Sequence, residues 1–239
     1  MTRLVAGELI KVRTTRTALG FAAAALLFVL LMVFISILAG HPRTIPDKQD
    51  SLNFGNITSF VLMLLGAVGA TGEFRHRTLA PAVLIAPDRL RLFAARTAAY
   101  ALTSLAVGVV LGIIAFAIGL PLLGGEAGPD LTGGDLTKIA VGGLIEIPLY
   151  TAIGVGFGTL VRNQVFAVVA LLVWVSIGEP LLGLLGNDVD HYLIGSTMTR
   201  IGSGGDDQVS FGQAILVAVA WTVVVCAIGA LVDRRRDVE

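Results

Sequence analysis

Five arginines are concentrated in one segment between two long apolar stretches, residues 72–96, which reads GEFRHRTLAPAVLIAPDRLRLFAAR. Its first part, EFRHRT, places an acid, two arginines, a histidine and a hydroxyl within six residues. Such side chains form ion pairs and charge-assisted hydrogen bonds with a protein partner. The segment has two interpretations: a docking surface for another protein, or positive charge that only sets the orientation of a membrane protein.

Glu146 is the one ionisable residue well inside an apolar run, and Pro148 follows it two positions later. A charged side chain at the centre of a bilayer costs about 2.5–3.5 kcal/mol, so we expect this carboxyl to face other helices. It is either a residue of a transport pathway that contacts a cationic substrate or a hydrogen-bonded carboxyl between helices beside a kink. We favour the second interpretation.

Catalysis by this chain is not expected. All three histidines, His41, His76 and His191, lie outside the apolar runs, which removes the usual base of an intramembrane serine protease. The sequence has no Walker A motif and no long His/Cys cluster, so we expect no bound cofactor, no metal site and no nucleic-acid partner. The single cysteine, Cys226, lies in an apolar run, and one cysteine allows no disulfide within the chain.

Composition predicts an all-α membrane protein. Apolar residues make up 55% of the chain and charged residues only 14%, whereas soluble domains have about 25% charged residues. A membrane helix needs about 20 mostly apolar residues. Six stretches meet this need, so we predict a single transmembrane domain over residues 1–239 with spans at approximately residues 17–40, 51–72, 97–125, 139–161, 163–185 and 208–232.

The placement of the basic residues predicts the orientation, although the net charge is zero. Thirteen of the seventeen lysines and arginines lie before the first span, between spans two and three, between spans four and five, or after span six. Four lie in the remaining connections, where nine of the seventeen acids are found, and a tenth, Glu179, lies near the adjoining end of span five. Because cytoplasmic loops carry the excess of basic residues, we predict that both termini are cytoplasmic.

The N-terminal residues MTRLVAGELIKVRTTR predict a helix that lies on the inner surface of the membrane. At 100° per residue Met1, Val5, Leu9 and Val12 share one face, and the basic residues point elsewhere. Such a helix buries its apolar face at headgroup depth and places its cations near anionic lipid. A simple positive anchor with no other role is equally compatible with this sequence.

Small residues at a spacing of four predict close helix packing in two places. Gly108 and Gly112 form one such pair, and Gly154 and Gly158 form the other. The second pair lies in GVGFG, which has no preceding strand and is therefore no nucleotide-binding loop. We expect both pairs to pack helices together, within the chain or at a subunit interface.

Several of these features together resemble the permease subunits of ATP-binding-cassette (ABC) transporters of the type-two exporter family. The resemblance rests on the six spans, on GELIKVRTTRT near the N-terminus, on GEFRHRT after span two and on GVGFGTLVRNQVFAVVALLVWVSIGEPLL, and it covers essentially the whole chain. It implies that a short cytoplasmic coupling helix between spans two and three docks onto a separate ATPase. The docking residues would be Glu73, Phe74, Arg75, His76, Arg77 and Thr78. Family members often have a glycine at the position of Arg77.

The resemblance also implies roles for other residues. Glu8 and Lys11 of the N-terminal helix would lie close to the same ATPase, and Arg162 and Asn163 would form a second cytoplasmic contact. A re-entrant or short external helix would precede span six.

The function that the resemblance implies is that of the transmembrane subunit of an ATP-driven exporter in the cytoplasmic membrane. Two copies, or this chain and a related permease chain, would form the path, and the few polar positions in the spans suggest a lipophilic or amphipathic cargo. Besides the cytoplasmic ATPase and the second permease chain, membrane lipid is an expected partner. The alternative is a membrane sensor or immunity module that binds a membrane-active compound without transporting it.

Overall fold

The computed structural model describes residues 1–75, 88–184, 186–205 and 209–235, and within these ranges the chain is helical with no strand. The two N-terminal helices are α1 (Thr2–Thr14) and α2 (Arg16–Leu38), and the short α3 (Ile45–Ser51) leads into α4 (Phe54–Arg75). Two long helices follow, α6 (Arg89–Leu123) and α7 (Gly133–Val161). The remaining elements are α8 (Gln164–Val173), the π-helical turn η1 (Trp174–Gly178), α9 (Glu179–Gly183), α10 (Asn187–Asp190), α11 (Ile194–Ser203) and α12 (Phe211–Arg235).

Six helical segments in the described ranges are long and apolar enough to cross a membrane, which confirms the six expected spans. Two of them begin earlier than the sequence indicates. Helix α6 starts at Arg89, where the side chain of Asp88 accepts a hydrogen bond from the amide of Arg91. Helix α7 starts at Gly133, where Thr132 and Asp135 form a capping box. In both cases polar capping residues begin the helix ahead of its apolar run.

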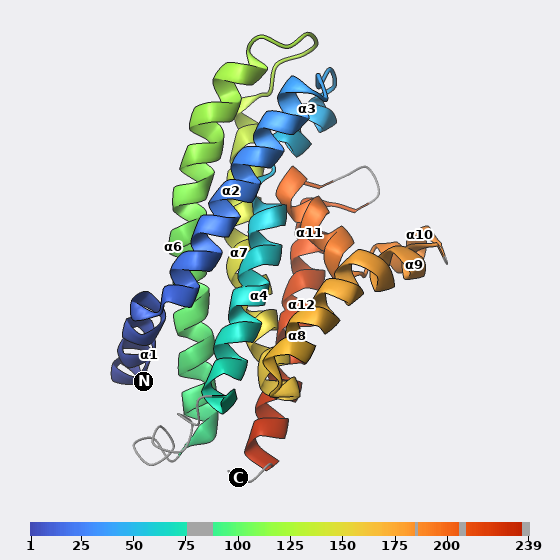
Figure 1. The fold of residues 1–239 in the computed structure, drawn as a ribbon. Coiled ribbons are helices and arrows are strands. Elements are labelled where there is room, and N and C mark those ends of the chain that lie inside the picture. Colours follow the sequence, from blue (N-terminus) through green and yellow to red (C-terminus); the bar gives the residue numbers. More distant parts are fainter. Residues whose placement is uncertain (76–87, 185, 206–208, 236–239) are drawn as a thin grey trace.

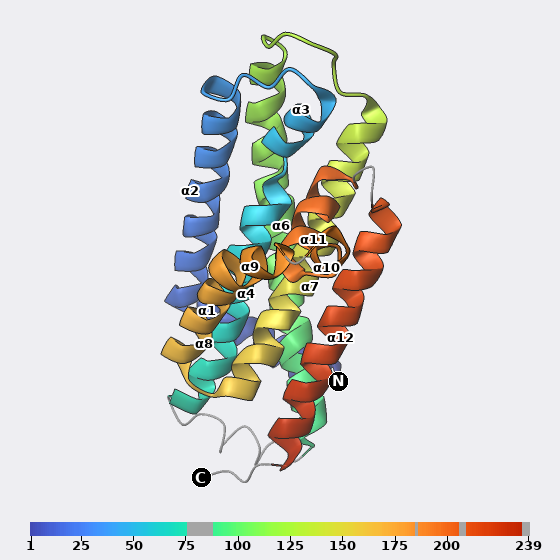
Figure 2. The same ribbon diagram turned by 90° about the vertical axis from the view of Figure 1, so that its right-hand side faces the viewer.

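Helices α4 and α7 form the centre of the bundle. They are the most buried of the six spans, whereas α8 and α12 are the least buried. Figure 1 shows α2 and α6 on one side of this pair, and Figure 2 shows α12 on the opposite side from α2. The side chains of α2, α4, α6 and α7 share one apolar cluster, and those of α4, α7, α8, α11 and α12 share another. The outer helices therefore all pack on a central pair.

Glycines allow this central pair to approach closely. A Cβ atom added at Gly154 would overlap the carbonyl oxygen of Met63, and one at Gly158 would overlap the main chain at Ala67. Both contacts lie between α7 and α4, so the expected close packing of this glycine pair is confirmed within the chain. Gly108 and Gly112 of α6 similarly face the side chain of Ile147 and the ring of Phe54.

The fifth span stops short of the far end of the bundle. After α8, the chain continues through η1 and α9 and turns at α10, beside the middle of the long helices (Figures 1 and 2). Helix α11 follows in the chain and packs against α7 and α12. The expectation of a short helix before span six is thus confirmed.

Candidate functional site

Many of the polar residues that the sequence singles out lie at the end of the bundle that carries both chain termini, which we call the termini-bearing end (Figure 1). Helices α4, α7 and α12 end here, and α6 and α8 begin here. Helix α1 packs against α6 at this same end. The opposite end, which we call the far end, carries α3 and residues 124–132.

Asp233, near the end of α12, ties three helices together at the termini-bearing end. Its carboxylate oxygen Oδ1 lies 3.3 Å from Nη2 of Arg162, which follows α7. Its main-chain carbonyl accepts a hydrogen bond of 3.0 Å from Nη1 of Arg89, the first residue of α6. Asp233 is buried, so these contacts lie within the protein and hold the ends of α6, α7 and α12 together.

Arg162 and Asn163 also shape the turn between α7 and α8. Arg162 ends α7 in the left-handed conformation (φ 59°), which is uncommon for a residue other than glycine. The side chain of Asn163 accepts a hydrogen bond of 3.1 Å from the amide of Phe166 and caps the start of α8. Both residues therefore have a structural role in this turn, and their contact with a partner protein stays a prediction.

The expected coupling residues fall at the edge of the described structure. Glu73, Phe74 and Arg75 form the last turn of α4, which directs the chain out of the bundle at the termini-bearing end. His76, Arg77 and Thr78 lie outside the described residues. Arg89, Arg91 and Arg96, from the same basic segment, belong to α6. The described parts of the basic segment thus form the last turn of α4 and the first turns of α6.

Glu8 and Lys11 lie on one face of α1. The Glu8 carboxylate is within hydrogen-bond distance of Nζ of Lys11, and both residues line a cavity of about 640 Å³ between α1, α2, α4 and α6. Although α1 lies at the surface, Glu8 is only 5% exposed. Val12 is buried with it on α1, whereas Met1 is exposed. The buried face of α1 therefore combines apolar side chains with an acid.

Glu146 lies near the middle of α7 and is fully buried against α4. Its Oε2 atom lies 2.8 Å from the position that a Cβ atom at Gly55 would take, and the Ser59 hydroxyl is close enough to interact with the carboxyl. Neither carboxylate oxygen has a hydrogen bond of good geometry within the described structure. The expected position between helices is confirmed, but the expected hydrogen bonding is not.

A second group of polar contacts holds α11 against the end of span five. The carboxylate of Glu179, which is 4% exposed, accepts hydrogen bonds from the amides of Ile194 and Gly195 and from Nε1 of Trp174. The first two donors are the free amides at the N-terminus of α11, where a negative charge is favourable. In the sequence Glu179 lies near the end of the predicted fifth span, and only the fold brings it to the start of α11.

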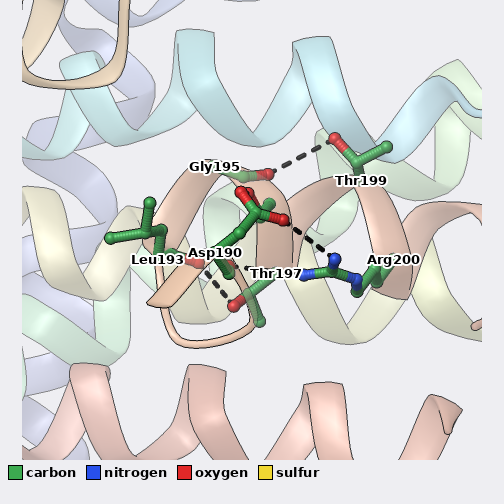
Figure 3. A network of polar contacts seen from close by, with 7 residues as sticks. Asp190, Leu193, Gly195, Thr197, Thr199 and Arg200 are labelled. Carbon is green, nitrogen blue, oxygen red and sulfur yellow. Dashed lines mark hydrogen bonds and ion pairs between the residues drawn. The ribbon is translucent and has the colours of Figure 1, made fainter. Parts of the chain in front are cut away.

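An ion pair completes this group on the other side of α11. Figure 3 shows the guanidinium of Arg200 directed at the carboxylate of Asp190, with an Nη2–Oδ2 distance of 2.9 Å. Burial by itself raises the pKa of the Asp190 carboxyl. The hydrogen bonds from Ser196 and Arg200 outweigh this effect and hold the pKa of Asp190 below its usual value. The pair therefore stays ionised at neutral pH and joins α10 to α11.

Removal of the Glu179 carboxylate should loosen this part of the fold. Glu179→Ala leaves the Trp174 indole and the amides of Ile194 and Gly195 without this acceptor. The Ile194 amide is buried, and a buried donor left unsatisfied costs about 1–3 kcal/mol. We expect a lower melting temperature of the purified protein and a changed tryptophan emission spectrum. Glu126→Ala is the matched control, because Glu126 lies in a far-end loop and its carboxylate pairs with the exposed His41 rather than with α11. Equal melting of the two variants would show that Glu179 does not hold α11.

Sequence reasoning missed the joining role of Asp233 and the capping role of Glu179. Asp233 lies directly before the three arginines that follow the last span, so its sequence context indicates only a charged tail. Its partners, Arg89 and Arg162, are distant in the sequence, and no local pattern signals such a contact.

Comparison with models of protein families gives no match to this chain, and comparison with curated proteins gives none either.

Proposed function

We propose that this chain is the transmembrane subunit of an ATP-driven ABC exporter and that a separate cytoplasmic ATPase docks at the termini-bearing end. The observation that carries the proposal is the charge distribution: thirteen of the seventeen basic residues lie in the segments expected on the cytoplasmic side. Several of these basic residues lie at the end of α4, the start of α6 and the end of α12. These three helix ends lie at the same end of the bundle (Figure 1). By the positive-inside rule this end faces the cytoplasm.

The arrangement of α4 and α6 supports a mechanical role for the basic segment. Helix α4 has an extensive contact with α7 at the centre of the bundle, and its last turn carries Glu73 and Arg75. Helix α6 begins with Arg89, which is bonded to the end of α12. A force applied between these two ends would therefore act on the central pair and on α12 together.

The cargo in this proposal is a lipophilic or amphipathic compound, and a second permease chain, identical or related, completes the path. The bundle itself encloses no wide channel of its own in the described residues, since α4 and α7 fill its centre. A path of sufficient width is therefore expected between two chains.

The docking proposal predicts that Arg75→Glu prevents capture of the partner ATPase while leaving membrane insertion and expression unchanged. Glu73→Ala should have the same effect, because Arg75→Glu reverses one charge of the proposed surface and Glu73→Ala removes another. We expect at least a tenfold loss in co-purification and loss of efflux. Arg43→Glu is the matched control, since it makes the same charge change on an exposed residue at the far end.

Two results would overturn the proposal. One is undiminished capture and efflux in both variants. The other is labelling of an Arg91→Cys variant by an impermeant thiol reagent added outside intact cells, with Cys226 replaced by serine, because it would put the basic segment on the external side. If the protein binds a membrane-active compound but supports no ATP-dependent efflux, that result would favour the sensor alternative.

A further inference from the structure

The cavity beside Glu8 is a second place where this chain could bind a molecule. It has a volume of about 640 Å³, within the range of about 300–1,000 Å³ that is common for ligand pockets. Residues of α1, α2, α4 and α6 form its wall, together with Gln164 at the start of α8. It lies at the termini-bearing end, beside the first turns of the apolar helix α2.

The lining of this cavity carries no net charge. Among the described residues that line it, Glu8 and Lys11 are the charged ones, one acid and one base. The remaining polar lining consists of threonine hydroxyls of α1 and α2, the Tyr100 side chain and an amide. A buried acid next to a half-exposed base complements a ligand that carries both charges, more than a net anion or a net cation.

The rest of the lining is apolar. Leu65 and Val68 of α4 and Ala18 of α2 form this part of the wall. Elsewhere on α2, Leu19 and Leu27 are exposed, so the outer surface of this helix is also apolar. A ligand with a charged head and hydrocarbon tails would therefore find a matching surface for both parts.

From these features we propose that the cavity binds the headgroup of a zwitterionic phospholipid with a primary amine, of the phosphatidylethanolamine class. The ammonium group donates hydrogen bonds to the Glu8 carboxylate, the phosphate contacts Lys11, and the acyl chains follow α2. The placement of this lipid in the inner leaflet rests on the proposed orientation, but the binding itself does not. Bound in this way, the lipid joins α1 to α4.

The test uses the purified full chain without any ATPase, so that its outcome is independent of the docking proposal. The protein is stripped of lipid in detergent, titrated with phosphatidylethanolamine, phosphatidylcholine or phosphatidylglycerol, and examined by native mass spectrometry. We expect at least fivefold tighter retention of phosphatidylethanolamine than of the other two lipids. Choline has no N–H donor for Glu8, and phosphatidylglycerol has no cation. Equal retention of all three lipids would overturn the proposal.

Two variants locate the binding in this cavity. Glu8→Gln should remove the preference for phosphatidylethanolamine, and Glu126→Gln, which changes an acid at the far end, should not. Gly72→Leu gives a second test that leaves Glu8 intact, because Gly72 lines the cavity and an added Cβ atom would meet nothing within 4 Å, so a side chain here starts in open space at the cavity. We expect loss of the tightly held lipid at an unchanged melting temperature.

Gly20→Leu is the control for Gly72→Leu, because Gly20 also faces open space but does not line the cavity. Retention of the lipid by Gly72→Leu at the level of Gly20→Leu would overturn the proposal. The proposal would also be overturned if the transported cargo were identified as a zwitterionic amphipath and displaced the lipid. The cavity would then be a cargo site.

Discussion

Gly154→Leu should prevent this chain from reaching a stable fold. A Cβ atom at Gly154 would lie 1.9 Å from the carbonyl oxygen of Met63, so a side chain fits only if α7 moves away from α4. Overpacking costs about 1–3 kcal/mol in ordinary cores. Here the obstacle is main chain at the centre of the bundle, which cannot change rotamer, so we expect a loss at or above the upper end of that range. Thermal unfolding in detergent, followed by size-exclusion chromatography, measures it.

The same substitution elsewhere on α7 separates this effect from a change in helix propensity. At Gly133, the first residue of α7, an added Cβ atom would meet nothing within 4 Å. Gly133→Leu should therefore melt at or above the temperature of the unaltered protein. If Gly154→Leu melts together with this control, the close approach of α4 and α7 does not stabilise the bundle.

The second large effect is expected at Glu146, where charge is the deciding property. Glu146→Lys places an ammonium group on a longer side chain against Gly55, in a fully buried site. A charge in the membrane interior costs about 2.5–3.5 kcal/mol on insertion scales, and the surrounding helices leave no room for the side chain to reach water. We expect little folded protein in a detergent extract of this variant.

Glu146→Gln should fold nearly as well as the unaltered protein, since a neutral amide has the shape of a protonated carboxyl. This variant also separates the two interpretations of Glu146. Full efflux by Glu146→Gln would identify the carboxyl as a packing group between α4 and α7. Loss of efflux from a variant that melts normally and still binds the ATPase would identify a residue of the transport pathway.

Local sequence determines the helices because their causes are local. Apolar runs of sufficient length predict the six spans, and the spacing of Gly154 and Gly158 predicts a packing face. The early starts of α6 and α7 are also local, since they depend on Asp88 and Thr132, but these residues look like loop residues until a helix is seen to begin at them.

Which polar residues contact one another depends on parts of the chain that are distant in the sequence. The sequence singles out Glu8 and Arg162 only through a resemblance, and it does not indicate that Glu8 faces a cavity or that Arg162 pairs with Asp233. Each of these contacts depends on which faces of two helices meet. A difference of one residue in helix register rotates a side chain by about 100°, so helix assignment alone does not determine the contacts.

This chain's composition and the length of its apolar runs by themselves determined that it is helical, with six helices long and apolar enough to span a membrane, because the transfer of a segment out of water depends mainly on its length and charge. The tertiary structure decided which residues act together: the junction at Asp233, the cap at the start of α11 and the cavity beside Glu8. The physical reason is that these sites form where helices from distant parts of the chain pack, and packing is set by close complementarity of their surfaces.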